Sequence, residues 1–168
     1  MDRTALRAVQ KPLKDRYREE PAAAFVTLRA DGELDASQIA CKVDTGRALV
    51  EAGLHPATGG TGALACSGDM LLEALVACAG VTLRSVATSM ELDVGGSVHA
   101  EGDLDFRGTL GVDREAPVGF ASIRLRFELT SGESEESLDK LIELTERYCV
   151  VFQTLAGGVP VELSYSSS

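Results

Sequence analysis

Four cysteines, at positions 41, 66, 78 and 149, are the residues of this sequence whose type is best suited to chemistry. No two of them form a CxxC pair, and the opening segment Met1–Lys14 lacks the apolar stretch and cleavage site of a signal peptide. A structural disulfide framework is not expected without secretion, so redox, metal and core roles remain. Redox chemistry would oxidise one thiolate to a sulfenic acid, which a second thiol captures as a disulfide.

Cys78 and Cys149 are the two cysteines that we expect on helices. Free cysteine is often buried and then behaves as a small apolar residue, so each of them alone is more typical of core packing than of catalysis. Cys41, on a predicted strand, and Cys66, just before a predicted helix, are expected to be small buried residues. A helix N-terminus lowers the pKa of a nearby thiol, which leaves a third redox role open for Cys66.

The helix that carries Cys78 is predicted from Asp69 to about Met90, with Ser67 as its N-cap. Asp69 in the first turn complements the positive end of the helix dipole. Apolar residues cover nearly the whole circumference of this segment, which indicates a helix in the core rather than on the surface.

A second helix, capped by Ser134 and ended by Gly157-Gly158, is expected to carry Cys149. One apolar stripe with spacings of three and four runs along it: Leu138, Leu141, Ile142, Thr145, Tyr148, Cys149 and Phe152. Cys149 would therefore lie on the buried face of this helix.

The remaining chain is predicted to form mainly strands around these helices. Residues 1–21 are expected to form an arm or a short helix (Thr4–Arg18), and residues 22–168 a single domain. Strands are predicted over 22–30 with a turn at Asp31-Gly32, within 38–52, and over 98–107, 118–130 and 159–165; a loop is expected over 55–62. The order of strands, buried helix, strands, helix and strand predicts an α+β fold.

The net charge of −10, spread along the chain, disfavours nucleic acid and anionic membrane surfaces as partners. We also expect no membrane span, because no run approaches about 18 apolar residues. Cytoplasmic localisation is the default expectation. No nucleotide-binding glycine motif is present, and a zinc site from Cys41, Cys66, Cys78 and His55 would lack the short ligand spacings of such sites, so we expect no cofactor and no metal.

Three segments together resemble the OsmC/Ohr family. Residues 61–82, TGALACSGDMLLEALVACAGVT, are similar to the central helix of that family, with a Gly-rich lead, an acidic first turn and a cysteine. Residues 146–155, ERYCVVFQTL, resemble its second motif, a tyrosine–cysteine pair followed by a short run to leucine. Residues 102–108, GDLDFRG, look like its middle strand, and the resemblance extends over about 22–165.

This resemblance implies antiparallel sheets around two central helices in an intertwined homodimer, with active sites at the interface. It also implies a thiol peroxidase for organic hydroperoxides, in which Cys78 attacks the peroxide and Cys149 resolves the sulfenic acid as a disulfide. A dithiol would then reduce that disulfide, and family members use lipoyl-type or small-molecule dithiols.

A buried thiol has a raised pKa unless a cation stabilises its thiolate. The resemblance implies an arginine for this purpose, either Arg29, in the region where the family places it, or Arg47 on the second strand. Each also reads as an ordinary solvated strand residue.

The family holds its arginine with a glutamate ten residues before the cysteine, but this sequence has Gly68 there. Asp69 follows it, and nine steps of about 100° put Asp69 and Cys78 on opposite helix faces. Asp69 is then mainly a dipole-compensating residue. Glu73, an acid within an apolar helix that requires a partner, is the better candidate to hold an arginine, either in catalysis or as a structural pair.

Two alternatives remain open. The absence of an acid at position 68 favours a non-catalytic or redox-sensing protein of the same fold that binds a small apolar ligand. A metal-dependent or hydrolytic enzyme would need a histidine beside Cys78, and the sequence does not place His55 or His99 there.

Overall fold

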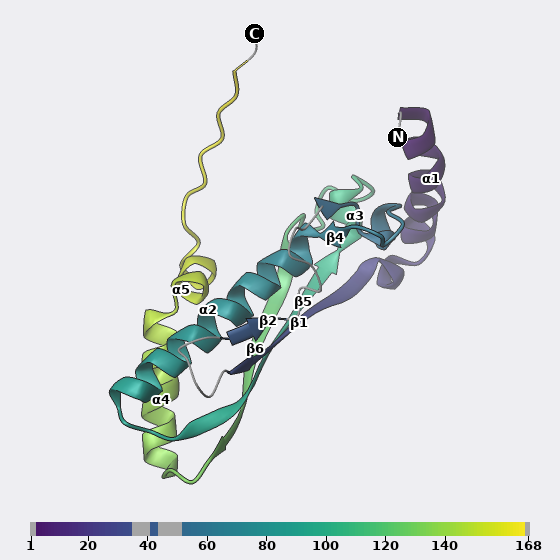
Figure 1. Cartoon of the computed structure of the whole chain (residues 1–168). Helices are drawn as coiled ribbons and strands as arrows, with labels where there is room; N and C mark the ends of the chain where they lie inside the picture. The colour runs from purple at the N-terminus through teal and green to yellow at the C-terminus, as the bar shows by residue number, and fades with distance from the viewer. Residues whose placement is uncertain (1–2, 35–40, 44–51, 167–168) are drawn as a thin grey trace.

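A computed structural model describes residues 3–34, 41–43 and 52–166, with only the backbone for residues 3–7, 9–10, 27–34, 41–43 and 52. The helices are α1 (Arg3–Glu19), α2 (Ser67–Ser89), α3 (Phe106–Thr109), α4 (Glu135–Tyr148) and α5 (Val150–Gly157), with short 3-10 helices η1 (Pro21–Ala24) and η2 (Pro56–Thr58). The strands are β1 (Phe25–Leu34), β2 (Cys41–Val43), β3 (Ala52–Gly53), β4 (Ala65–Cys66), β5 (Val94–Asp105) and β6 (Phe120–Ser131). Figure 1 shows their arrangement, with α2 lying along the sheet.

The main sheet has four antiparallel strands in the order β2-β1-β5-β6. A separate parallel pair, β3 and β4, lies just before α2. Helices and antiparallel strands in one chain agree with the α+β class expected from the sequence.

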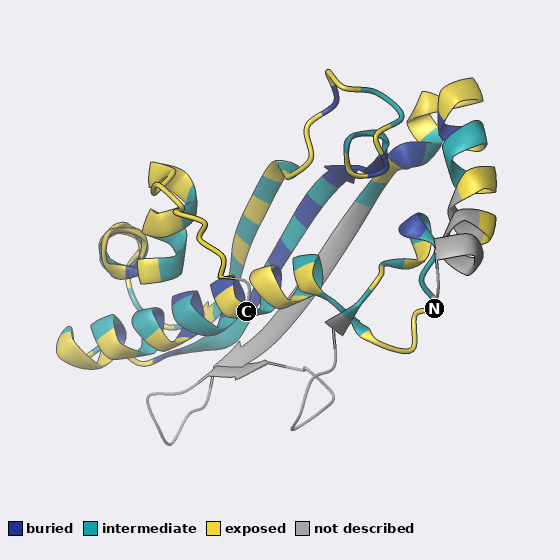
Figure 2. Cartoon of the chain, turned by 90° about the horizontal axis from the view of Figure 1, so that it is seen from above, coloured by how far each residue is buried: buried dark blue, intermediate teal, exposed yellow. Residues whose placement is uncertain are grey.

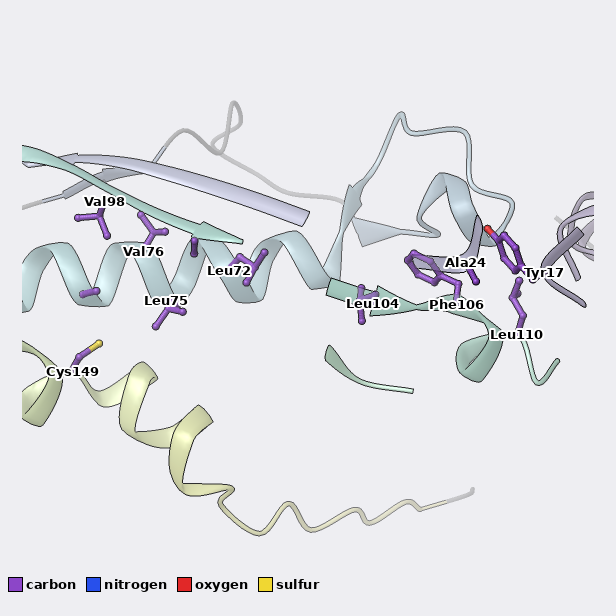
Figure 3. Packing of buried hydrophobic residues seen from close by; sticks show 12 residues of the cluster. Tyr17, Ala24, Leu72, Leu75, Val76, Val98, Leu104, Phe106, Leu110 and Cys149 are labelled. Carbon is purple, nitrogen blue, oxygen red and sulfur yellow. The ribbon is translucent and has the colours of Figure 1, made fainter. Parts of the chain in front are cut away.

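One face of the sheet packs against α2. Val98, Ala100 and Leu104 alternate along β5 with more exposed residues, so that period-2 patterning directs them to the same face. They meet Leu72 and Val76 of α2 in the core, which Figure 3 shows from close by. In Figure 2, buried and intermediate residues alternate along most of β5, and intermediate and exposed residues alternate along most of β6.

The other face of the sheet is polar. Arg124 on β6 forms ion pairs with Glu101 and Asp103 on β5, and the Ser122 hydroxyl donates a hydrogen bond to Asp103. Cross-strand pairs of opposite charge suit a solvated sheet face. The sheet thus has an apolar face toward α2 and a charged face away from it.

Helix α2 is long and apolar enough, by length and composition alone, to cross a membrane, contrary to the sequence-based expectation. Its contacts are those of a core helix, because it packs against β1, β5, α4 and α5. Leu71 and Val81 nevertheless remain 37% and 40% exposed on this helix. Part of its apolar surface is therefore uncovered in the single chain.

The helix expected over Thr4–Arg18 is observed as α1. Tyr17, which is 2% exposed, donates a hydrogen bond of 2.7 Å from its hydroxyl to the Ala57 carbonyl in η2. This contact fixes α1 to the segment that leads into α2.

Two local expectations were wrong. Asp31-Gly32 is no turn, because both residues lie within β1 and are paired with His99 and Val98 of β5. The N-cap of α2 is Cys66 rather than Ser67, which is already the first helical residue. Sheet pairing across the whole of β1 outweighs the local turn preference of the Asp-Gly pair.

The long helix predicted from Ser134 to Gly157 is in fact two helices. Ser134 caps α4 as expected, accepting a hydrogen bond from the Ser137 N–H, but the backbone of Cys149 is extended (φ −73°, ψ 105°) and separates α4 from α5. The β-branched pair Val150-Val151 that follows has low helix propensity, which favours a break here. Tyr148 is 56% exposed, so its predicted place on the buried stripe was wrong.

The strand predicted over 159–165 is not formed within this chain. Residues 159–166 have no regular secondary structure, and they extend away from the rest of the molecule in Figure 1. Val161, Leu163 and Tyr165 are each 89–90% exposed. The apolar alternation of this tail therefore has no partner surface among the described residues of the chain.

Candidate active site

The fold brings Cys78 and Cys149 together. Cys78 lies in the middle of α2, and Cys149 lies at the junction of α4 and α5, both of which pack against α2. Both are free thiols, and the Cys149 side chain is hydrogen-bonded to Cys78. In Figure 3 the sulfur of Cys149 points toward α2. Of the predicted site residues, these two are therefore in contact.

The break at Cys149 directs the start of α5 at the sulfur atoms. The first backbone N–H groups of a helix have no acceptor within the helix. Here the N–H groups of Val150 and Val151 donate hydrogen bonds to Cys78, and the N–H of Phe152 donates to Cys149 Sγ over 3.4 Å. Without the break, these N–H groups would bond to carbonyls of α4 instead.

Opposing effects act on the pKa of Cys78. Burial of this half-buried side chain is the largest single effect and raises the pKa. Hydrogen bonds from the Val151 N–H, the Cys149 thiol, the Thr82 hydroxyl and the Val150 N–H stabilise the thiolate, and together they bring the pKa below its ordinary value.

The pKa of Cys149 is shifted in the opposite direction. Its side chain is 1% exposed, and burial is the main cause that raises its pKa to about 11. The neighbouring Cys78 adds to this rise, because a thiolate there favours a protonated donor beside it, while the Phe152 N–H acts against it. The pair thus favours ionisation of Cys78 before that of Cys149.

The structure places the predicted arginines only in part. The backbone of Arg29 lies in β1, in register with Glu101 of β5, but its side chain is outside the described residues, as is the whole of Arg47. A role for either one near Cys78 stays a prediction.

The backbone donors of α5 were missed by the sequence analysis, although the Val-Val pair after Cys149 was a signal for a helix break.

Asp69 and Glu73, the two acids predicted as site residues on α2, lie in different environments. Asp69 is half-buried, and burial raises its pKa while the nearby His55 acts to lower it. The His55 ring stacks on Phe106 with centroids 4.9 Å apart, and its Nδ1 accepts a hydrogen bond from the Ala57 N–H. The role of Asp69 as a dipole-compensating residue stays a prediction. Glu73 is half-buried and has an interaction partner, as its place in an apolar helix requires.

Cys66 does not belong to the cysteine pair. It is half-buried, caps α2 through its backbone without a side-chain hydrogen bond, and packs at the edge of the main core. Among the described residues no group of three or more histidine, cysteine or acidic side chains could hold a metal ion. The side chain of Cys41 lies outside the described part of the chain.

A pocket of about 140 Å³ adjoins Cys149 between α2, β6, α4 and α5. Its lining is mostly apolar, with two polar residues: Ala79, Leu125, Phe127, Ile142, Thr145, Glu146, Cys149 and Phe152. A cavity of about this size can hold a molecule as large as benzene. Cys78 is not among the residues that line it.

Comparison with protein families gives the class of the protein. The model of the family described as OsmC-like protein matches residues 60–164, which include both cysteines, and the chain belongs to this family. None of the curated proteins matches it.

Among solved structures, the chain is similar to an OsmC-like hydroperoxide resistance protein from Jannaschia sp. CCS1. The two share 18% sequence identity with a TM-score of 0.54, over 83% of this chain and 91% of the other. They therefore have the same fold.

Proposed function

We propose that this protein is a thiol peroxidase for organic hydroperoxides, with Cys78 as the attacking thiolate and Cys149 as the resolving thiol. The observation that carries the proposal is the opposite perturbation of two contacting thiols. The pKa of Cys78 is lowered by the hydrogen-bond donors around it, whereas burial raises that of Cys149 to about 11. Membership of the OsmC-like family and the hydroperoxide resistance protein of the same fold support the peroxide as substrate.

The proposed reaction begins when the Cys78 thiolate attacks the terminal oxygen of the hydroperoxide. The O–O bond breaks, Cys78 becomes a sulfenic acid, and the leaving alkoxide takes a proton to become an alcohol. The Cys149 thiol then attacks the Cys78 sulfur, and the displaced hydroxide leaves as water with the thiol proton. A dithiol reductant reduces the resulting disulfide, as a cytoplasmic setting would allow.

We also propose that the functional unit is a homodimer. The single chain leaves Leu71 and Val81 of α2 partly uncovered, and Val161, Leu163 and Tyr165 of the tail almost fully exposed. Exposed apolar patches are typical of interaction sites, and a partner chain would cover these side chains. A second copy that pairs with residues 159–165 as a strand would bury this alternating tail.

Titration with one equivalent of cumene hydroperoxide per chain tests the proposal. We expect the loss of two thiols and a disulfide that joins Cys78 and Cys149, identified by mass spectrometry of unreduced peptides. Cys66 should remain alkylatable throughout. If Cys78 and Cys149 both stay reduced while the peroxide persists, the peroxidase proposal is wrong, and the apolar pocket would favour a ligand-binding protein instead.

A further inference from the structure

Three consecutive N–H groups leave the helical hydrogen-bond ladder at the break between α4 and α5. The ladder of α4 ends with the Cys149 N–H, which donates to the Thr145 carbonyl over 2.9 Å. It resumes in α5 with the Gln153 N–H, which donates to the Cys149 carbonyl over 2.9 Å. The N–H groups of residues 150–152 lie between these two bonds and donate to the sulfur atoms. The break therefore frees donors for the thiols and takes the helical partners away from carbonyls of α4.

Gln153 replaces one of the helical bonds that the break removes. In a continuous helix the Val150 N–H would donate to the carbonyl four residues earlier, that of Glu146. Here the Val150 N–H donates to Cys78 instead. The Gln153 side chain donates from Nε2 to the freed Glu146 carbonyl over 2.9 Å. The same residue is thus bonded to α4 through its side chain and to Cys149 through its backbone.

This side-chain bond belongs to the broken arrangement alone. Residues seven apart lie about 10 Å from each other along a continuous helix, which is two full turns. In such a helix the Glu146 carbonyl would also be occupied by the Val150 N–H. The Gln153 amide reaches this carbonyl because α5 starts in a new direction at the extended backbone of Cys149. A bond that exists in one of two arrangements stabilises that arrangement.

We propose that Gln153 is a positioning residue for Cys78: its amide bridges the break and holds the first N–H groups of α5 directed at the Cys78 sulfur. This inference rests on the proposed role of Cys78 as the attacking thiolate, and it adds the group that keeps the donors of that thiolate in place. The Val150 N–H has two competing acceptors, the Cys78 sulfur and the Glu146 carbonyl. The Gln153 amide favours the sulfur, because it satisfies the carbonyl without that N–H.

Gln153→Met tests the inference, because methionine is similar in length and helix propensity but has no N–H donor. The rate at which iodoacetamide alkylates Cys78 is measured against pH in the reduced full-length protein. The bond of Gln153 is exposed, so we expect a modest effect: the midpoint for Cys78 should rise by about half a pH unit. Thr154→Val, at the next exposed position of α5, should leave the midpoint unchanged. No rise in Gln153→Met would overturn the inference.

The same substitution in a Val150→Pro background shows whether Gln153 acts through the break. A proline ring at residue 150 clashes with the carbonyl of residue 146, so it enforces the break without the glutamine. We expect Gln153→Met to cause no further rise of the Cys78 midpoint in this background. An equal rise in both backgrounds would contradict the proposed role. Alkylation needs no peroxide, so these outcomes are independent of the peroxide titration that tests the peroxidase proposal.

Discussion

Cys78→Ser is expected to reduce the consumption of cumene hydroperoxide to the background rate, because a serine hydroxyl does not ionise near neutral pH and cannot be oxidised to a sulfenic acid. Cys149→Ser should behave differently. It retains the attacking thiolate, so we expect one rapid turnover followed by arrest. The sulfenic acid at Cys78 should then accumulate, because no thiol converts it to the disulfide. Peroxide consumption is followed with a ferrous-xylenol orange assay, and the sulfenic acid is trapped with dimedone.

Cys66→Ser provides the matched control, since this cysteine is half-buried like Cys78 but lies outside the contacting pair. It should preserve multiple turnovers. Sustained turnover in Cys149→Ser would show that another thiol resolves the sulfenic acid. Residual turnover in Cys78→Ser would move the attacking role away from α2.

Val150→Pro is expected to raise the pKa of Cys78 and to slow the peroxide step, because it removes a single backbone N–H that donates to Cys78. Proline is well tolerated at the first position of a helix, and Val150 is the first residue of α5. The extended backbone of Cys149 is also compatible with a following proline. A hydrogen bond to a charged group contributes roughly 1.5–3 kcal/mol, so the pKa of Cys78 should rise by about one to two units.

When the pH lies below the pKa of Cys78 in both proteins, each unit by which the substitution raises the pKa should reduce the thiolate fraction about tenfold. The peroxide step should slow by the same factor. Stopped-flow fluorescence of the first turnover measures this rate. Val150→Ala retains the N–H and should retain the low pKa, so that it separates the backbone donor from the valine side chain. If proline and alanine at this position react alike, the N–H of residue 150 does not stabilise the thiolate.

Much of the architecture could be predicted from the sequence, because hydrophobic periodicity records burial. The apolar circumference of residues 69–90 predicted the buried helix α2, and the alternation from Val98 to Leu104 predicted the inner face of β5. Phe106, which was expected to continue this strand, begins α3 instead. The Ser134 cap was predicted as well, since its side-chain oxygen acts only on the backbone next to it.

The features that were missed depend on tertiary contacts. Asp31-Gly32 has the composition of a turn, yet pairing of β1 with β5 from Phe25 to Glu33 holds it in a strand. The break at Cys149 interrupts an apolar stripe that continues through it, so periodicity alone predicted one helix. The strand expected over 159–165 needs a partner strand, and local pattern cannot say which chain supplies it.

The candidate site also depends on tertiary contacts that the sequence does not reveal. The resemblance to a family paired Cys78 with Cys149 correctly as neighbours, but it directed attention to an arginine as the group that ionises Cys78. A sequence names side chains, whereas Val150 and Val151 act through backbone N–H groups. Such donors become visible only when the helix that presents them is placed against the thiol.

The central claim is that Cys78 is the ionised thiol of the pair and that hydrogen-bond donors at the start of α5 lower its pKa. The rate of alkylation of each cysteine by iodoacetamide, measured against pH by mass spectrometry of the reduced protein, tests it most directly. Because the thiolate is the reactive form, the rate at Cys78 should decline only as the pH falls through a midpoint below that of an ordinary thiol, about 8.5. Cys149 should become reactive only as the pH approaches its raised value of about 11. A midpoint for Cys78 at or above that of an ordinary thiol, or a lower midpoint for Cys149 than for Cys78, would contradict the account.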